Sequence, residues 1–423
     1  MDTKTRELKE GIHLYLLPDM KFKNCVMNIS FGMPLRKETA TGLALLPKLL
    51  TAGNSVYPDR SALHMAMENL YGARFSVKSE KIGETQVITF GGDVISDRYA
   101  EEDLFAKLSE AIMTVLFAPQ TEGEGFKTSV FEREKETLRE DIRSIVNDKR
   151  RYALVRCAEE MCKDEPYGIS AEGDEAGLSL CTPENTYALY KELLKTASVN
   201  IFICGAFDEK TATEAAEKLA DKLGGRKPEK ESVLRPVPKT VKYVMDREPV
   251  QQGKLVIGYR TEVQPDTDAW YTLMVYNAIF GGGTSSKLFN NVREKMSLCY
   301  YASSGLEKAK GLMFVQSGIE FDKYEVALSA IEAQRETILK GEIDEAEFGG
   351  AVQGIVNQLR SYKDAPTLMA SYMGRQILAG AGADIDVAIE KILAVKPGDI
   401  PQIAGKVHID TVYFLNEAEG ETK

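Results

Sequence analysis

Short apolar runs alternate with amphipathic stretches from the start of the chain onward. The runs His13–Leu17 and Cys25–Phe31 are bounded by turn residues, which is typical of short strands. The stretches 41–52 and 60–71 keep the three- and four-residue spacing of helices, and Gly72 follows the second as a common helix stop. The chain therefore opens as a mixture of strands and helices.

The same mixture continues to residue 223 and then repeats. In the remainder of the first part we expect strands at 74–79, 86–94 and 199–204 and helices near 101–117, 129–149, 182–194 and 210–223. In the second part we expect strands at 254–259, 299–306, 312–320 and 412–415 and helices at 268–280, 285–295, 324–340 and 344–359. Both parts have the order strand, helix, short helix, strand pair, long helices and closing strand.

A segment with linker composition separates the two parts. Residues 224–238 read GGRKPEKESVLRPVP, with two glycines, three prolines and alternating charge. We therefore predict a domain at 1–223, a linker at 224–238 and a domain at 239–423. The octets LYGARFSV (Leu70–Val77) and LCYYASSG (Leu298–Gly305) form a local echo that indicates a large internal repeat. We predict an α+β fold of two tandem homologous domains, each packing helices on a mostly antiparallel sheet.

Composition then narrows the functional classes. Of the 423 residues, 43% are hydrophobic and 28% are charged, as in ordinary globular proteins. The 53 basic and 64 acidic residues give a net charge of −11, which argues against nucleic-acid binding. The first twelve residues lack the apolar segment of a secretory signal, and no stretch approaches the roughly 20 apolar residues of a membrane helix. The six cysteines include no CxxC pair, so we expect a cytoplasmic protein without membrane association.

The strongest local motif lies in the second part, where Phe280–Tyr301 reads FGGGTSSKLFNNVREKMSLCYY. This run resembles the glycine-rich turn, SS-x-L-F helix start and V-R-E-K-x-x-L-x-Y segment of the insulinase/pitrilysin family of zinc peptidases, whose two tandem α+β halves are also similar. The resemblance implies that Arg293 and Tyr300 bind substrate. Arginine offers several fixed donors to a peptide, and a tyrosine hydroxyl can stabilise an oxyanion. Without the flanking motif, Arg293 would be interpreted as a solvated residue at the end of a helix, and Tyr300 as a strand residue whose ring is packed.

The same resemblance points to a metal motif that this chain lacks. Active members of the family carry H-x-x-E-H on a helix of the first half, where two histidines bind zinc and the glutamate polarises a metal-bound water. The corresponding residues here are Leu45, Lys48 and Leu49. The third ligand of the family falls on Asp141, or on Glu140 if the alignment shifts by one residue. One carboxylate without histidines makes a poor zinc site, so we expect no metal, no cofactor and no catalytic residue in this chain.

Other candidate sites are weaker. His64 and Glu68 have the i, i+4 spacing of metal ligands, but two ligands are too few, and His64 reads as a surface residue. The triple glycine at 281–283 lacks the spacing of a phosphate-binding loop, and the acidic stretch 132–140 reads as a solvated helix face. A Cys–His nucleophile pair stays open, because the sequence does not reveal which side chains meet in space.

Three functional hypotheses follow. We favour the first, which the resemblance implies: the chain is the non-metal subunit of a heteromeric peptidase, inactive alone. In this hypothesis it binds a peptide and supplies Arg293 and Tyr300 to the zinc site of an H-x-x-E-H partner subunit, with a homodimer as the other possible assembly. In the second hypothesis the chain is a binding or structural protein on a peptidase fold. In the third it is an active metallopeptidase with an unusual site.

Overall fold

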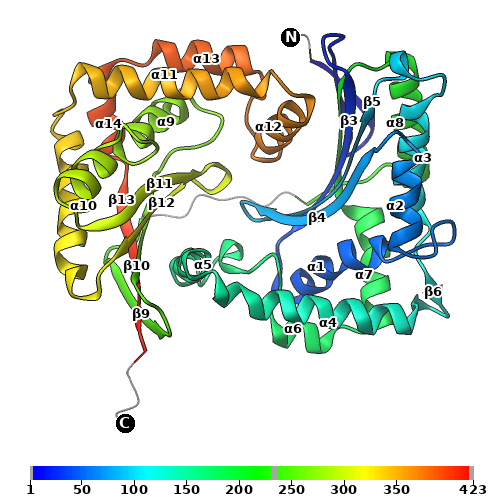
Figure 1. Cartoon of the computed structure of the whole chain (residues 1–423), viewed down its shortest axis with the longest axis horizontal. Coiled ribbons are helices and arrows are strands. Elements are labelled where there is room, and N and C mark those ends of the chain that lie inside the picture. The colour runs from blue at the N-terminus through cyan, green and yellow to red at the C-terminus, as the bar shows by residue number, and fades with distance from the viewer. Residues whose placement is uncertain (1–2, 230–236, 419–423) are drawn as a thin grey trace. The chain divides into compact units, whose positions relative to one another are not determined.

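A computed structural model of the chain describes residues 3–229 and 237–418 (Figure 1). These residues form two compact units, each built from segments that are not contiguous in sequence. Unit 1 takes residues 1–143, 169–231 and 362–378, and unit 2 takes residues 144–168, 232–361 and 379–423. Residues 230–236 of the predicted linker lie outside the described residues. The prediction of a mixed α+β fold is confirmed, since each unit packs helices on a sheet.

Unit 1 is built on a six-stranded sheet with the strand order β1-β2-β8-β3-β5-β4. The strands are β1 Lys4–Lys9, β2 Ile12–Pro18, β3 Asn24–Pro34, β4 Arg74–Ile82, β5 Thr85–Ile95 and β8 Ser198–Gly205. Neighbouring strands are antiparallel except for the parallel pair β2 and β8. The central strands β3 and β8 are almost continuously buried, which explains their near-continuous apolar sequences.

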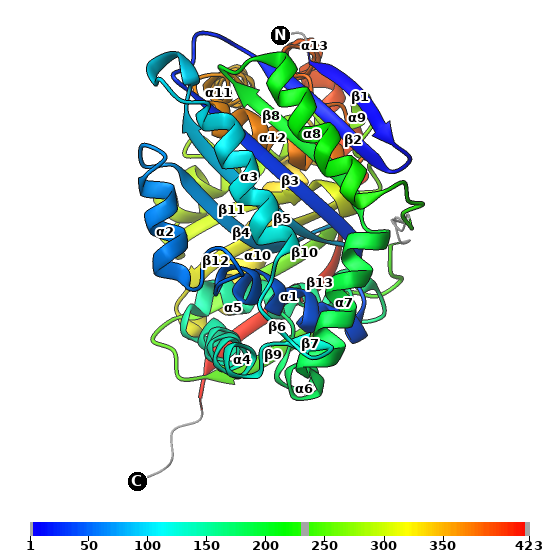
Figure 2. The same cartoon turned by 90° about the vertical axis from the view of Figure 1, so that its right-hand side faces the viewer.

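Helices cover one face of this sheet, as Figure 2 shows for α3 and α8. The helices of the first part that belong to unit 1 are α1 Lys37–Thr51, α2 Arg60–Glu68, α3 Leu104–Phe117, α4 Thr128–Ser144, α6 Glu175–Leu180, α7 Pro183–Thr196 and α8 Glu209–Leu223; the short pair β6 Thr121–Glu122 and β7 Gly125–Phe126 lies between α3 and α4. Their apolar faces join Ile29, Phe31 and Phe90 of the sheet in one continuous core. The other face carries polar side chains such as Ser30 and Thr89, and residues 366–378 pack over part of it against Phe202.

Unit 2 repeats the topology of unit 1. Its sheet has the strand order β11-β12-β10-β13-β9, with β9 Lys242–Glu248, β10 Gly253–Arg260, β11 Cys299–Glu307, β12 Leu312–Ile319 and β13 His408–Glu417. Each of these strands corresponds in order and direction to β2, β3, β4, β5 or β8 of unit 1, including the parallel pair β13 and β9. Its remaining helices are α9 Asp268–Phe280, α10 Tyr324–Leu339, α11 Glu345–Tyr362, α13 Ile385–Ala394 and α14 Ile400–Ala404. The octets that echo each other in sequence therefore lead into equivalent edge strands, β4 and β11.

Each half of the chain gives one helix to the unit formed mainly by the other half. Helix α5, Lys149–Met161, packs on β10 and β13 of unit 2, where Cys157 and Met161 are buried. Helix α12, Pro366–Leu378, packs on the equivalent strands β8 and β3 of unit 1. The two halves of the chain therefore exchange a helix in both directions. The predicted boundaries at residues 223 and 239 place α5 with the first domain and α12 with the second, whereas each packs in the other unit.

The predicted helix at 129–149 shows how this exchange escaped the sequence pattern. The structure ends α4 at Ser144, places a single turn at Ile145–Asn147, and begins α5 at Lys149. The side chain of Asp148 caps α5 by accepting a hydrogen bond from the Arg151 amide at 3.0 Å. Helical spacing continues through the turn, so the predicted helix runs past the end of α4 to residue 149, and α5 was not predicted as a separate helix.

Among the described residues, no helix has both the length and the apolar character needed to cross a bilayer.

Candidate functional site

The positions that the family resemblance assigns to a metal lie on α1. Leu45 and Leu49 are 0% and 2% exposed, and both pack in the apolar core of unit 1. Pro47 lies well inside the helix, which begins at Lys37, so the proline removes one helical hydrogen bond beside these positions. The two leucines contribute packing, and neither has an atom that binds zinc.

Lys48, at the glutamate position of the motif, forms an ion pair with Asp141 on α4. The ammonium nitrogen of Lys48 lies 2.6 Å from a carboxylate oxygen of Asp141. Of the two residues that the sequence left open for the third ligand, Asp141 is therefore the one that faces the degenerate motif. The carboxylate of Asp141, the remaining candidate metal ligand, is therefore already paired with the ammonium group of Lys48. Among residues 3–229 and 237–418, no group of three or more His, Cys, Asp or Glu side chains is arranged to hold a metal ion. The donor set does not fit zinc.

A second carboxylate of α4 is buried, which sequence reasoning missed. Glu134 is 0% exposed, and its two oxygens lie 2.5 Å from an Arg60 nitrogen and 3.0 Å from an Arg133 nitrogen. The expectation that the whole stretch 132–140 is a solvated face is therefore wrong at this position. The signal was present in the spacing, because Phe131, Glu134 and Leu138 share one helix face and the other two are core residues.

Arg293 lies near the end of a turn of π-helix, Leu288–Lys295, that follows the glycine-rich segment. Its guanidinium lies over the ring of Phe289, 4.6 Å from the ring centre, and 3.5 Å from a carboxylate oxygen of Glu294. The side chain is 39% exposed. The stacking on Phe289 restricts the side chain on one face while the guanidinium edge keeps donors available to a ligand.

Tyr300 is exposed because the start of β11 contains a bulge. Cys299 pairs with Ile319 and Tyr301 with Gly318, so Tyr300 is an extra residue opposite this step of β12. Its side chain is 64% exposed and lines a cavity of about 690 Å³. The other lining residues of this cavity are Gln251, Gln252, Glu320, Phe321, Asp322 and Glu417.

The next residue, Tyr301, has a different environment. Its ring packs against Gly318 and lies under the Arg150 guanidinium, 4.4 Å from its ring centre. Burial raises the pKa of Tyr301 to about 12. Of the two adjacent tyrosines, Tyr300 is therefore the one with a hydroxyl open to a ligand. No hydrogen bond or ion pair joins Arg293 to Tyr300 in the described part of unit 2.

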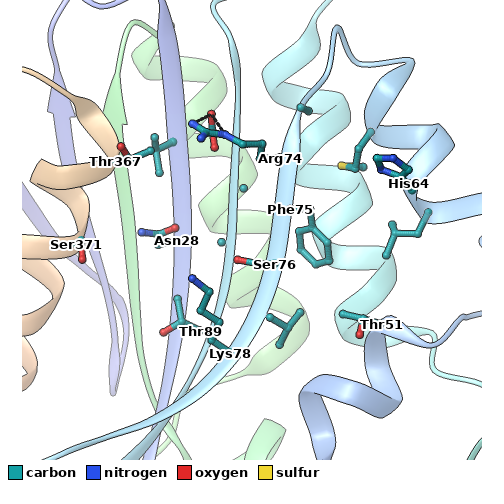
Figure 3. Close-up of a pocket in the computed structure, with 18 of the residues that line it drawn as sticks. Asn28, Thr51, His64, Arg74, Phe75, Ser76, Lys78, Thr89, Thr367 and Ser371 are labelled. Carbon is teal, nitrogen blue, oxygen red and sulfur yellow. Dashed lines mark hydrogen bonds and ion pairs between the residues drawn. The ribbon is translucent and has the colours of Figure 1, made fainter. Parts of the chain in front are cut away.

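A groove of about 1070 Å³ with both polar and apolar lining extends from the face of the unit 1 sheet beside α12, past the edge strand β4, to α2 (Figure 3). Its floor includes Asn28 of β3, Lys78 of β4 and Thr89 of β5, and one wall is α12 with Thr367 and Ser371. The sequence did not reveal this groove, because α12 and the strands of the floor lie far apart in the sequence. Its charged groups are already partnered in part: Arg74 pairs with Asp93 at 2.8 Å, and Arg375 of α12 pairs with Glu80 of β4 at 2.9 Å.

His64 lines the outer end of this groove. Its position confirms the prediction that His64 is a surface residue. The side chain is 75% exposed, and its Nε2 atom lies 3.8 Å from Glu68. The six cysteines are all buried, and burial raises the pKa of each thiol above its ordinary value. These thiols are protonated at neutral pH, so none has the character of a nucleophile paired with histidine.

Comparison with known proteins agrees with a degenerate peptidase. Residues 181–355 match the family described as Peptidase M16 inactive domain. The chain is 32% identical over 419 residues to the "Probable inactive metalloprotease YmfF" of Bacillus subtilis (strain 168), with 97% of each chain covered. It is similar over its whole length to the crystal structure of a conserved protein from Enterococcus faecalis V583, with 28% identity and a TM-score of 0.91. The structure of a peptidase M16 inactive domain from Pseudomonas fluorescens, at 15% identity and a TM-score of 0.82 over both whole chains, shares the fold. The chain therefore belongs to the insulinase/pitrilysin peptidases, the M16 family, as a degenerate member without the zinc motif.

Proposed function

We propose that this chain is the non-metal subunit of a heteromeric peptidase, and that it supplies Arg293 and Tyr300 to the zinc site of an H-x-x-E-H partner. One contrast carries the proposal. The metal positions are filled by two core leucines and by the ion pair between Lys48 and Asp141. Arg293 and Tyr300, in contrast, keep exposed polar groups that no core contact of the described structure requires.

The two side chains would divide the work by their chemistry. Arg293 would donate hydrogen bonds from its guanidinium edge to a carbonyl or carboxylate of the peptide and so fix its position. Tyr300 would donate a hydrogen bond from its hydroxyl to the oxygen that gains negative charge when the peptide carbonyl is attacked. The bulge in β11 supports this role, because bulges re-aim side chains next to ligands.

Peptide binding has separate support in unit 1. The groove beside α12 offers amide, hydroxyl and ammonium groups from Asn28, Ser76, Lys78 and Thr89, which are suitable partners for the donors and acceptors of a peptide backbone. Because this groove lies in the unit without Arg293 and Tyr300, it also supports the second hypothesis, a binding protein that takes no part in catalysis.

Complementation of a partner's activity distinguishes these two functions. The purified chain would be mixed with an H-x-x-E-H member of the family from the same genome, and cleavage of a quenched fluorescent peptide would be followed. We expect the mixture to cleave faster than the partner alone. We expect Arg293→Ala and Tyr300→Phe each to reduce kcat/KM of the mixture by about 100-fold, the usual cost of removing one transition-state donor.

The matched controls are Arg360→Ala on α11 and Tyr99→Phe in unit 1, since both residues are exposed and lie outside the two candidate sites. Both control variants should complement like the wild type. Absence of any gain in cleavage over the partner alone, together with peptide binding to the isolated chain, would reject the proposal in favour of a binding protein.

Zinc content tests the third hypothesis. We expect the isolated chain, after chelation, reloading with zinc and dialysis, to retain less than about 0.1 zinc per chain, because a carboxylate paired with lysine is the one ligand left at the motif. Mass spectrometry of the metal content gives the measurement. One zinc per chain would show an unusual metal site and overturn our account of the degenerate motif.

A further inference from the structure

The exchanged helix α5 leaves part of one face of the unit 2 sheet uncovered. It packs on β10 and β13, and β11 at the edge of the sheet lies beyond it. Lys254 of β10 pairs with Gly318 of β12, and Gly318 pairs with Tyr301 of β11, so these three residues form a row across one face. Val256, two residues along β10 from Lys254, packs with α5, so the row lies on the face that α5 partly covers.

The ring of Tyr301 forms the floor of a small site in this row. A Cβ atom at Gly318 would lie 2.5 Å from the ring, so a side chain there would have to displace the ring from its position across β12. The guanidinium of Arg150, from the first turn of α5, lies 4.4 Å from the ring centre, and the ammonium nitrogen of Lys254 lies 6.0 Å from it. Two cations from different elements therefore converge on one aromatic ring.

Both cations have neutral hydrogen-bond partners. The Nε of Arg150 donates to the amide oxygen of Gln316 at 3.1 Å, and its Nη2 donates to the hydroxyl of Ser303 at 3.3 Å. The ammonium of Lys254 donates to the amide oxygen of Gln252 at 2.7 Å. A guanidinium has five N–H donors and an ammonium has three, so these bonds use two donors of Arg150 and one of Lys254. Each cation keeps donors for a ligand.

Among the described residues, no carboxylate forms an ion pair with either cation. Asp148 raises the pKa of the Tyr301 hydroxyl, but its carboxylate caps α5 through the Arg151 amide, 3.0 Å away. Burial and the charge of Arg150 both lower the pKa of Lys254. The two positive charges repel each other in the chain as it stands, and an anion bound between them would remove this repulsion.

The internal repeat offers a comparison in unit 1. Each exchanged helix reaches the edge strand of its sheet with an arginine: Arg375 of α12 reaches β4, and Arg150 of α5 reaches β11. Arg375 meets the carboxylate of Glu80 at 2.9 Å, whereas Arg150 meets the hydroxyl of Ser303. The chain itself therefore supplies the anion in unit 1 and leaves the arginine of unit 2 without one.

We propose that Arg150 and Lys254 bind a carboxylate group of a peptide beside the ring of Tyr301. The guanidinium can present two parallel N–H groups to the two carboxylate oxygens, and the ammonium adds a second charge. The net charge of −11 disfavours polyanions such as nucleic acids. An acidic side chain and a C-terminus offer the same carboxylate chemistry.

The site adjoins the position of Tyr300. Gln252, the partner of Lys254, lines the same cavity as Tyr300, and Tyr300 precedes Tyr301 in the chain. A peptide held at Tyr300 would therefore bring its neighbouring residues to the two cations. That the carboxylate belongs to a peptide rests on the proposed function, whereas the affinity of the two cations for a carboxylate does not.

Acetylation of lysine amines, followed residue by residue with mass spectrometry, tests the site on the full chain. N-hydroxysuccinimidyl acetate reacts with the neutral amine, so a carboxylate that pairs with the Lys254 ammonium slows the reaction there. The probe is N-acetylglutamate α-amide, which has one carboxylate and no amine. It is used at about 50 mM, because so small a ligand binds with a dissociation constant on the order of millimolar.

The expected result is specific to one lysine. We expect the probe to slow acetylation of Lys254 about 5-fold or more, relative to sodium chloride of equal ionic strength. Lys210, which is 83% exposed, should react at an unchanged rate. N-acetylglutamine α-amide, in which a carboxamide replaces the carboxylate, should not protect Lys254.

Two variants separate recognition by Arg150 from simple exposure. Arg150→Gln should reduce the protection of Lys254 to less than about 2-fold, because the guanidinium that holds the carboxylate is gone. Arg360→Gln removes another exposed arginine of unit 2 and should keep the full protection. Lack of protection in the wild type, protection by the carboxamide probe, or equal protection in the two variants would each overturn the proposal.

Further probes identify the source of the carboxylate and keep this proposal distinct from the peptidase function. N-acetylalanine carries only a C-terminal carboxylate, so stronger protection by it than by N-acetylglutamate α-amide would assign the site to a peptide C-terminus, and the reverse order to an acidic side chain. If Lys254 is protected but the chain does not complement an H-x-x-E-H partner, the peptidase function fails and the carboxylate site stands. Complementation without protection of Lys254 would reject the site alone.

Discussion

A fragment that contains residues 1–231 alone is expected not to fold. This fragment carries every strand of the unit 1 sheet, yet it lacks α12, which covers β8 and β3. Met369 and Met373 of α12 are each 2% exposed in the whole chain. Burial of a methionine side chain stabilises a protein by about 1.5–3 kcal/mol, so these two account for about 3–6 kcal/mol. The net stability of a typical domain is about 5–15 kcal/mol, so the loss removes a large part of it.

The complementary fragment, 232–423, lacks α5 and should fail for the same reason. Cys157 and Met161 of α5 pack on Val256 and Tyr413, which would be left exposed to water. Each fragment contains the helix that the other requires. We therefore expect the two fragments to be recovered as a soluble complex when they are expressed together, and as insoluble or non-cooperatively unfolding chains when they are expressed separately.

A matched control separates loss of a helix from a simple break in the chain. A protease site inserted between residues 231 and 232 of the full chain would be cut after folding, and the two pieces should stay together with a cooperative thermal transition in circular dichroism. Fragment 1–231 that unfolds alone with the transition temperature of the whole chain would contradict our interpretation of the exchange.

The exchange also marks the limit of what the sequence could predict about the fold. Strands such as β3, β8 and β10 were predictable, because they are buried and have near-continuous apolar runs, whereas strand β1 and helix α12 were not predicted. Which sheet a helix covers depends on contacts between residues far apart in sequence. Helix α5 has helical spacing that continues from α4, and nothing local shows that its apolar face meets β10. Strand β9 was missed because four of its seven residues, KYVMDRE, are charged and its apolar run is only three residues long.

Some features of the candidate site could likewise be predicted from the sequence, and others depended on the structure. The loss of the metal motif could be predicted from the sequence alone, because it depends only on the identities of Leu45, Lys48 and Leu49. The choice between Glu140 and Asp141 did need one, since it depends on which carboxylate of α4 faces Lys48. The exposure of Tyr300 depends on a one-residue bulge relative to β12, and a bulge is a property of the strand pair.

Removal of Arg260 is expected to cause the largest loss of stability by a single substitution. Its guanidinium is 7% exposed and lies 2.6 Å from oxygens of both Glu165 and Asp410. The other oxygen of Glu165 lies 2.8 Å from the nitrogen of Lys310, which is fully buried. Breaking a buried ion pair by removing one partner typically costs about 3–5 kcal/mol, because a charge is left without compensation. We expect Arg260→Met to lower the free energy of unfolding by that amount in urea titrations at pH 7.

The comparison variant is Arg143→Met. Arg143 also forms two short hydrogen bonds with a carboxylate, that of Glu175, but its side chain is 59% exposed. Exposed ion pairs contribute about 0–1 kcal/mol, so this variant should lose little stability. Equal effects of the two substitutions would show that burial does not determine the role of Arg260.

The effect of Arg260 should also depend on pH, with a sign that follows from Glu165. Burial raises the pKa of this carboxyl, but hydrogen bonds from Arg260 and Lys310 outweigh burial and hold its pKa below the ordinary value. A depressed pKa stabilises the folded state above the pKa of the unfolded chain, about 4.3, and this stabilisation is lost as the pH falls through the folded value. In Arg260→Met one of the two donors is gone and burial remains, so Glu165 takes up its proton at a higher pH. We therefore expect the stability difference between wild type and variant to shrink between pH 5 and pH 3, and a difference that stays constant over this range would show that the ionised state of Glu165 plays no part.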